Sequence, residues 1–182
     1  TLTGRVTTWS KFKTTYQIDL DKIEIAGEGA LLKIIEDRKK RLREKGYFDQ
    51  ETKKKIPYLP SRIGVITSPT GSVIHDIINR VSERFKTPID LWPVAVQGTE
   101  APQNIIDAIN GFNSINDQNK PDVIIIARGG GSTEDLMAFN DEKLAVAVSK
   151  SDIPIISAIG HETDTTIIDY VSDLRASTPT AA

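Results

Sequence analysis

The sequence predicts an α/β protein: a doubly wound, mainly parallel sheet of about four strands with helices on both faces, preceded by a small β segment. Two observations support this fold class. Four short apolar runs alternate with stretches whose apolar residues recur at helical spacing, a pattern typical of parallel sheets. With 182 residues, of which 38% are apolar and 26% charged, the chain is also long enough to bury one core of ordinary size.

The predicted elements follow one another regularly after residue 62. Strands are expected at 63–67, 90–96, 123–127 and 153–159. Helices are expected at 72–85, 102–112, 133–138, 141–149 and 163–171. Pro93 favours an edge position for the second strand, because proline cannot donate to the ladder. The candidate N-caps are Ser72, Ser132 and Asn140.

The first 60 residues have a different character. Residues 2–27 alternate roughly and are rich in β-branched and aromatic residues, which predicts two strands. Their aromatic side chains are suited either to stacking on bases or to packing within a hairpin. This group contains Trp9, Phe12 and Tyr16, with Arg5, Lys11 and Lys13 nearby.

A basic helical segment follows. Its apolar residues predict a helix that ends at Gly46, and Pro57 and Pro60 mark a boundary. Residues 36–56 contain nine Lys or Arg against five Asp or Glu. Such a surplus is compatible with a solvated helix face or with a surface that follows phosphates.

Composition excludes several classes of site. The chain has no cysteine, which removes disulfides, thiolate catalysis and cysteine-bound zinc, and which fits a cytoplasmic protein. The net charge of -2 gives no global signal for nucleic acid, although a local basic patch remains compatible with it. We find no signal peptide and no apolar run of roughly 18 residues, so no membrane association is expected.

Polar segments follow each of the four predicted strands, at 68–76, 97–100, 128–135 and 160–164. Ligands of open parallel sheets bind outside the carboxyl ends of the strands, so these segments are expected to form one site. Glycines let a ligand approach the backbone, and N–H groups at helix starts favour phosphate. The candidate phosphate- or DNA-binding residues are Ser68, Thr70, Gly71, Gly129, Gly130, Gly131 and Ser132.

Four side chains at this edge suit phosphate chemistry. Arg128 is able to hold a phosphate with two parallel hydrogen bonds, and His161 is able to move a proton near neutral pH. Asp76 and Asp164 are candidates to orient the histidine, to polarise a water or to hold a divalent cation. The group is more informative than any one member.

Each candidate has a simpler structural explanation. Arg128 is also compatible with an ordinary ion pair at a strand end, and His161 with a buried, hydrogen-bonded histidine. Asp76 and Asp164 are compatible with offsetting the charge of helix N-termini. Asp135 is compatible with a capping arrangement with Ser132. The glycines match neither the dinucleotide-binding nor the P-loop spacing.

Four segments resemble the large subunit of bacterial exodeoxyribonuclease VII: residues 46–60, residues 62–77, RGGGSTEDL at 128–136, and residues 160–182, which begin GHETD. The resemblance implies the final strands of an OB-fold at 1–27, a basic helical linker at 28–60, an α/β catalytic domain at 61–176, and the start of a helical region at 177–182. It also implies a small-subunit partner, bound through that helical region.

The same resemblance implies hydrolysis of single-stranded DNA from either end, releasing oligonucleotides with 5′-phosphates. By motif, the catalytic residues fall on Asp76, Arg128, His161 and Asp164. Better-known family members need no added metal, but some respond to magnesium, so Mg²⁺ at Asp76 and Asp164 stays open. The alternatives are a non-catalytic module that binds single strands, and a small-molecule phosphotransfer enzyme, against which the missing P-loop counts.

Overall fold

An N-terminal hairpin and a larger α/β unit make up the computed structural model, which describes residues 2–9, 15–23 and 28–182. By its internal contacts the chain divides into two compact units, residues 1–34 and residues 35–182. In the first unit β1 (Leu2–Trp9) and β2 (Thr15–Ile23) pair antiparallel, which confirms the two predicted strands. Their assignment to an OB-fold stays a prediction, and Lys11, Phe12 and Lys13 lie outside the described residues.

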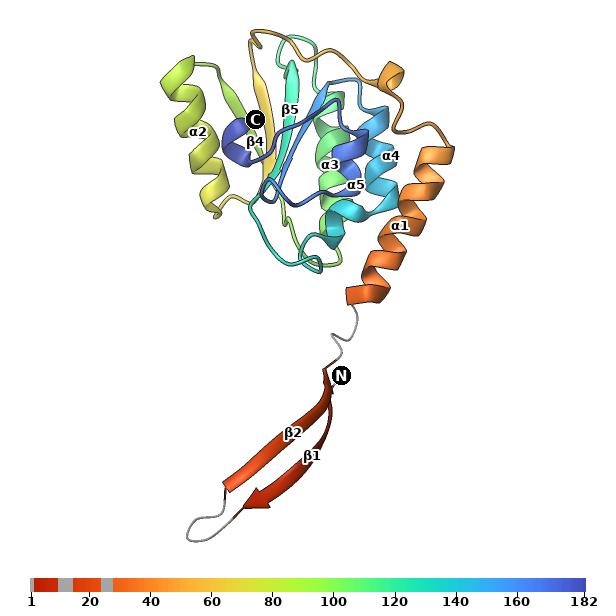
Figure 1. The fold of residues 1–182 in the computed structure, drawn as a ribbon. Helices are drawn as coiled ribbons and strands as arrows, with labels where there is room; N and C mark the ends of the chain where they lie inside the picture. Colours follow the sequence, from red (N-terminus) through yellow and green to blue (C-terminus); the bar gives the residue numbers. More distant parts are fainter. Residues whose placement is uncertain (1, 10–14, 24–27) are drawn as a thin grey trace. The chain divides into compact units, whose positions relative to one another are not determined.

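The second unit is built on a five-stranded parallel sheet (Figure 1). In chain order its strands are β3 (Ile63–Thr67), β4 (Ile89–Pro93), β5 (Val123–Arg128), β6 (Ile155–Ile159) and β7 (Leu174–Arg175). Their order across the sheet is β4-β3-β5-β6-β7, which is a doubly wound arrangement. The predicted fold class and the edge position of Pro93 are confirmed.

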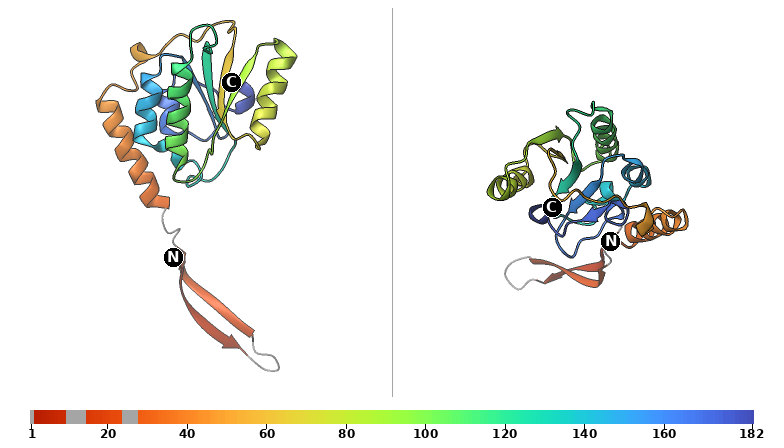
Figure 2. Two further views of the ribbon diagram at one scale, coloured as in Figure 1. Left: turned by 180° about the vertical axis from the view of Figure 1, so that it is seen from behind. Right: turned by 90° about the horizontal axis from the view of Figure 1, so that it is seen from above.

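Helices cover both faces of this sheet, as Figure 2 shows. One face carries α2 (Ser72–Arg84), against which the C-terminal turn η3 (Pro179–Ala181) packs. The other carries α3 (Ala101–Ser114), η2 (Met137–Asn140), α4 (Glu142–Lys150) and α5 (Ile167–Val171). Alternate residues of β5 point to opposite faces, so Ile124 and Ile126 enter one core while Val123 and Ile125 enter the other.

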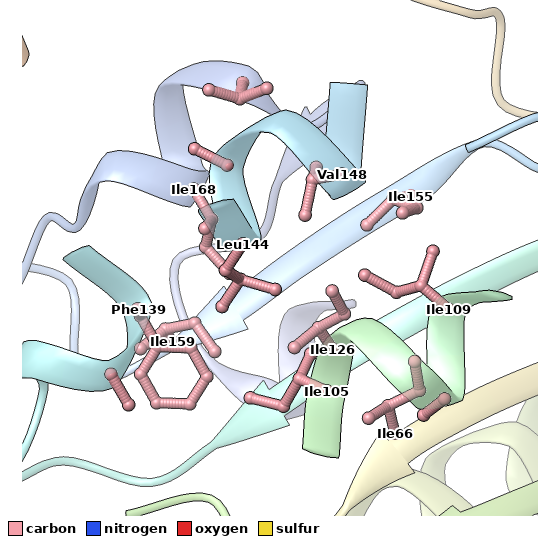
Figure 3. Close-up of a cluster of buried hydrophobic side chains, with 14 of the residues drawn as sticks. Ile66, Ile105, Ile109, Ile126, Phe139, Leu144, Val148, Ile155, Ile159 and Ile168 are labelled. Carbon is pink, nitrogen blue, oxygen red and sulfur yellow. The ribbon is translucent and has the colours of Figure 1, made fainter. Parts of the chain in front are cut away.

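The larger core lies between the sheet and the helices α3, α4 and α5 (Figure 3). Isoleucines from β3, β5 and β6 meet isoleucine, leucine and valine side chains from these helices, and Phe139 of η2 closes one end. The central strands β3 and β5 are buried throughout. They therefore give a rigid base for the loops that leave their carboxyl ends.

The helix α1 (Glu28–Glu44) continues into the larger unit, where its residues from 35 onward pack beside α4 and η2. Leu42 is fully buried, and Arg41 donates two hydrogen bonds to Glu142, which lower the pKa of that carboxyl. The helix ends as predicted at Gly46, whose φ is 77°. The main-chain N–H of Tyr47 returns there to the carbonyl of Leu42, which closes the last turn. A short turn, η1 (Gln50–Thr52), follows.

Several predicted boundaries are wrong. The strand predicted at 90–96 ends at Pro93. In place of the helix predicted at 133–138, residues 133–136 form turns and residues 137 and 138 begin η2. The helix predicted from 163 begins only at Ile167, because Thr166 and Asp169 form its capping box. The two-residue strand β7 is too short for its alternation to be visible in the sequence.

Two of the predicted N-caps are also wrong. Ser72 is the first residue of α2, and Gly71 occupies the cap position. Asp141 caps α4, accepting hydrogen bonds from the N–H groups of Lys143 and Leu144. Asn140 is instead buried and accepts a hydrogen bond from the N–H of Ile167. Its side chain therefore links η2 to the start of α5.

A leucine truncation tests the docking of α1. Leu42→Ala is expected to lower the free energy of unfolding by about 2–5 kcal/mol, because it leaves a cavity under the helix. Leu59→Ala is the matched control: Leu59 is 57% exposed, and its loss should cost no more than about 0.5 kcal/mol. Urea unfolding of both variants measures the difference. Equal, small effects would show that α1 contributes little to the core.

Candidate active site

The candidate site lies where the sheet changes winding direction. The chain leaves β3 toward β4 on one side and leaves β5 toward β6 on the other, so the loops after β3 and β5 diverge. In doubly wound sheets this divergence opens the crevice that binds ligands. The loop after β5 starts close to the first turn of α2: a Cβ on Gly129 would lie 3.6 Å from Cγ2 of Val73.

Arg128 ends β5, and its side chain is largely buried within its own loop. The Nη1 group donates to the carbonyl oxygens of Gly129, at 2.9 Å, and Gly130. The Nη2 group lies 3.5 Å from Oε1 of Gln97 and 3.9 Å from Oδ2 of Asp135. A strand-end ion pair is therefore a minor part of its surroundings. The main-chain carbonyls, which carry no net charge, fix the guanidinium.

Asp135 closes the glycine loop. Its Oδ2 accepts hydrogen bonds from the main-chain N–H of Ser132, at 3.1 Å, and from the Ser132 hydroxyl, at 2.9 Å. The N–H of Asp135 in turn donates to that hydroxyl. These bonds, reinforced by the charge of Arg128, lower the pKa of Asp135 below its usual range. The predicted arrangement of Ser132 with Asp135 is confirmed, and the Ser132 N–H is engaged by a carboxylate.

His161 and Asp164 belong to one tight turn directly after β6. Gly160 opens this turn with a φ of 72°, and its N–H donates to the carbonyl of Arg128 at 2.9 Å. Oδ2 of Asp164 accepts from the main-chain N–H of His161 at 2.8 Å and lies 3.8 Å from His161 Nδ1. The imidazole is 75% exposed, so the alternative of a buried histidine is wrong.

The imidazole of His161 lies directly over the glycine loop. A Cβ placed on Gly130 would overlap its Cε1 and Nδ1 atoms, and one placed on Gly131 would overlap the guanidinium of Arg128. Both functional groups thus rest against backbone that has no side chain. The glycines permit this contact, which supports the interpretation that they allow close approach.

The structure brings Arg128, His161 and Asp164 together but gives Asp76 no contact with them. Asp76 is half-buried on α2, one turn after Val73, and within residues 28–182 no hydrogen bond or ion pair links it to the other three. It is the fifth residue of its helix, and Asp164 precedes α5 by three residues. Neither carboxylate lies in a first helical turn. In the loop before α2, Ser68 and Thr70 are joined through their hydroxyls at 3.3 Å.

Sequence reasoning missed two residues of this region. Gln97 approaches Arg128, and Arg175 of β7 donates through Nη2 to the carbonyls of Glu162, at 3.0 Å, and Asp164, at 2.7 Å. The signal for Arg175 was weak, because its position depends on a strand of two residues. Gln97 begins one of the four predicted segments, but no pattern distinguished it.

The described ranges hold neither a metal cluster nor a helix that could span a membrane. Among these residues no group of three or more histidine or carboxylate side chains is placed to hold a metal ion. The helices described there are also too short or too polar to cross a bilayer.

Comparison with known proteins identifies the family of the chain. The sequence model of the family described as "Exonuclease VII, large subunit" matches residues 47–182. The chain belongs to this family. The match begins in the turn that ends α1 and includes every strand of the sheet. All residues of the candidate site therefore lie within the matched range.

Several similar proteins are named exodeoxyribonuclease 7 large subunit. That of Rhodospirillum centenum is 55% identical over 183 residues, covering 99% of this chain and 35% of the relative. That of Anaplasma marginale (strain Florida) is 54% identical, covering 99% and 44%. That of Ruegeria sp. (strain TM1040) is 53% identical, covering 100% and 36%. The chain therefore spans less than half the length of these relatives.

A pair of glycine substitutions tests the contact between the two loops. Gly130→Ala is expected to displace the His161 ring, because its methyl group would occupy the position of that ring. The exposed imidazole is free to move aside, so the loss of stability should be small. Gly129→Ala, whose methyl group would meet only Val73 at an ordinary distance, is the matched control. NMR shifts of the His161 ring should change in the first variant and not in the second.

Proposed function

We propose that the chain is the catalytic core of an exodeoxyribonuclease VII, which hydrolyses phosphodiester bonds of single-stranded DNA. It would act from both the 5′ and the 3′ end and release 5′-phosphorylated oligonucleotides in the cytoplasm. The observation that carries the proposal is the contact of the Arg128 loop, which borders the winding switch of the sheet, with the His161–Asp164 turn after the neighbouring strand β6. Family membership supports the same reaction class.

In this mechanism a water molecule attacks the phosphorus in line with the P–O3′ bond. That bond breaks, the 3′-oxygen takes up a proton, and the phosphate stays on the 5′ side of the next nucleotide. Arg128 and the free N–H groups of the glycine loop would stabilise the charge that grows on the phosphate oxygens. The Gly129 and Gly130 carbonyls already orient the guanidinium before DNA binds. An incoming phosphate would compete with these carbonyls for its N–H groups.

His161 would act as general base or general acid in this reaction. Its exposed ring is accessible to substrate, and Asp164 sets its position by holding the main-chain N–H of His161. At 3.8 Å the carboxylate is just beyond hydrogen-bond distance of Nδ1, a separation that closure on a substrate commonly reduces. Asp76 would contribute from α2, by orienting the attacking water or, beside Asp164, by holding a magnesium ion.

The complete enzyme would include a small subunit, as the name of the relatives' large subunit indicates. The hairpin unit and the loop residues Ser68, Thr70 and Gly71 would contact the single-stranded DNA. The alternative is a module that binds single strands without cleaving them. Both hypotheses predict binding, so product formation decides between them.

Replacing the histidine tests the mechanism. His161→Ala in the full-length protein with its small subunit should abolish shortening of a labelled single-stranded oligonucleotide, because the proton-transfer group is lost. Binding of that oligonucleotide should remain largely intact. His75→Ala, at the exposed second histidine of this sequence, is the control and should retain the wild-type rate. Full activity of the His161 variant would refute its role, and binding without shortening by the wild type would favour the non-catalytic module.

Metal dependence is tested separately. The same complex is assayed with a chelator and with added magnesium. Arginine and histidine chemistry alone predicts that the rate in the chelator stays within about 10-fold of the rate in magnesium, since no metal would bear transition-state charge. If the chelator stops the reaction, Asp76→Asn and Asp164→Asn should each raise the magnesium concentration required for half-maximal rate.

A further inference from the structure

Arg175 lies behind the His161–Asp164 turn, on the strand β7. Its backbone pairs with Ser157 of β6, two residues before that strand ends. From there the side chain extends to the turn, where one nitrogen, Nη2, donates to the carbonyls of Glu162 and Asp164. The guanidinium therefore joins the edge strand of the sheet to the segment that carries the candidate catalytic histidine.

The turn is held from two directions. From within, the carboxylate of Asp164 accepts from the His161 N–H, and the Asp164 N–H donates to the His161 carbonyl at 3.0 Å. From outside, Arg175 holds the carbonyls of Glu162 and Asp164. Since Gly160 gives this turn a left-handed start with no side chain to restrict it, the Arg175 contacts limit how far the turn can swing.

Beside Arg175 lies the carboxylate of Asp169, which does not hold the guanidinium firmly within the described residues. Its Nε atom is buried without a hydrogen-bond partner, and so is Oδ1 of Asp169, whose other oxygen lies 4.0 Å from that Nε. Oδ2 of Asp169 is already engaged by the N–H and hydroxyl of Thr166 in the cap of α5. The pair of Arg175 with Asp169 is therefore a loose one, and the hydrogen bonds of the guanidinium go to the turn.

We propose that Arg175 is a positioning residue that fixes the His161–Asp164 turn against the Arg128 loop. It does not touch the substrate; it acts through the carbonyls of Glu162 and Asp164. The inference rests on the proposed function, because it assigns Arg175 to the same reaction. A one-ångström shift of a catalytic group commonly costs about 100-fold in rate, which is the scale on which such a clamp matters.

An alternative role for Arg175 is direct contact with a DNA phosphate, since its side chain is about one-third exposed. The two roles predict different measurements. If Arg175 contacts a phosphate, replacing it should weaken DNA binding and reduce the salt dependence of binding. If Arg175 positions the turn, replacing it should lower kcat while the affinity for DNA and its salt dependence stay unchanged.

The test compares Arg175→Ala, Arg175→Lys and the control Arg80→Ala in the full-length protein with its small subunit. Arg80 is an exposed arginine of α2 whose ion pair among the described residues is with nearby Glu83, so its variant should match the wild type. We expect both Arg175 variants to lose about 10–100-fold in kcat, with KM, oligonucleotide affinity and its salt dependence unchanged. Added guanidinium ion should restore much of the rate to Arg175→Ala and none to Arg175→Lys, whose side chain fills the space.

The outcomes separate this inference from the proposed function. Wild-type kcat in the Arg175 variants, or a loss confined to KM and salt dependence, would overturn the positioning role. If the wild-type complex fails to shorten DNA, the proposed function fails, but an NMR comparison of this chain still decides the clamp. Arg175→Lys should then shift the backbone resonances of residues 161–164 while leaving those of residues 104–112 in α3 nearly unchanged, and unshifted resonances in 161–164 would refute it.

Discussion

One main-chain hydrogen bond ties the candidate site together: the N–H of Gly160 donates to the carbonyl of Arg128. It continues the parallel register of β5 and β6, in which Arg128 stands opposite Ile159. Because both strands are buried, neither can slide without exposing apolar side chains. The glycine loop and the His161 turn therefore leave the sheet at one level, and their contact follows from strand pairing.

The main-chain carbonyls of the glycine loop hold the positively charged side chain of this site. Carbonyl oxygens, which carry no net charge, hold Arg128, whereas the carboxylate of Asp135, 3.9 Å away, is used mainly by Ser132. A full ion pair would have neutralised the guanidinium and made an incoming phosphate pay for breaking it. Carbonyl contacts orient the same group and preserve its attraction for anions. Such preorganisation is what charge stabilisation in a transition state requires.

The sheet was predictable because its central strands are continuous apolar runs, and the Gly46 helix end because glycine there adopts a positive φ. The helix boundaries near the site were less accessible. Whether Asn140 caps the following helix or turns inward depends on α5, which is remote in sequence, and the structure shows that it turns inward. Residues 133–138 have helical composition, yet the Ser132–Asp135 bonds close a turn there. Local propensity competes with tertiary contacts, and near the site the contacts decide.

The same contrast separates the parts of the site. Arg128, His161 and Asp164 stand directly at strand ends, so the topology of a parallel sheet is enough to gather them. Arg175 reaches the turn only through a long side chain on a two-residue strand, and no sequence pattern encodes that reach. Asp76 is the intermediate case, since α2 brings it to the correct edge but its half-buried carboxylate contacts none of the other three described residues. Asp76 is selected from the sequence because it lies in the segment that follows the first strand. A substrate phosphate that contacts both α2 and the glycine loop would connect it to the other three residues.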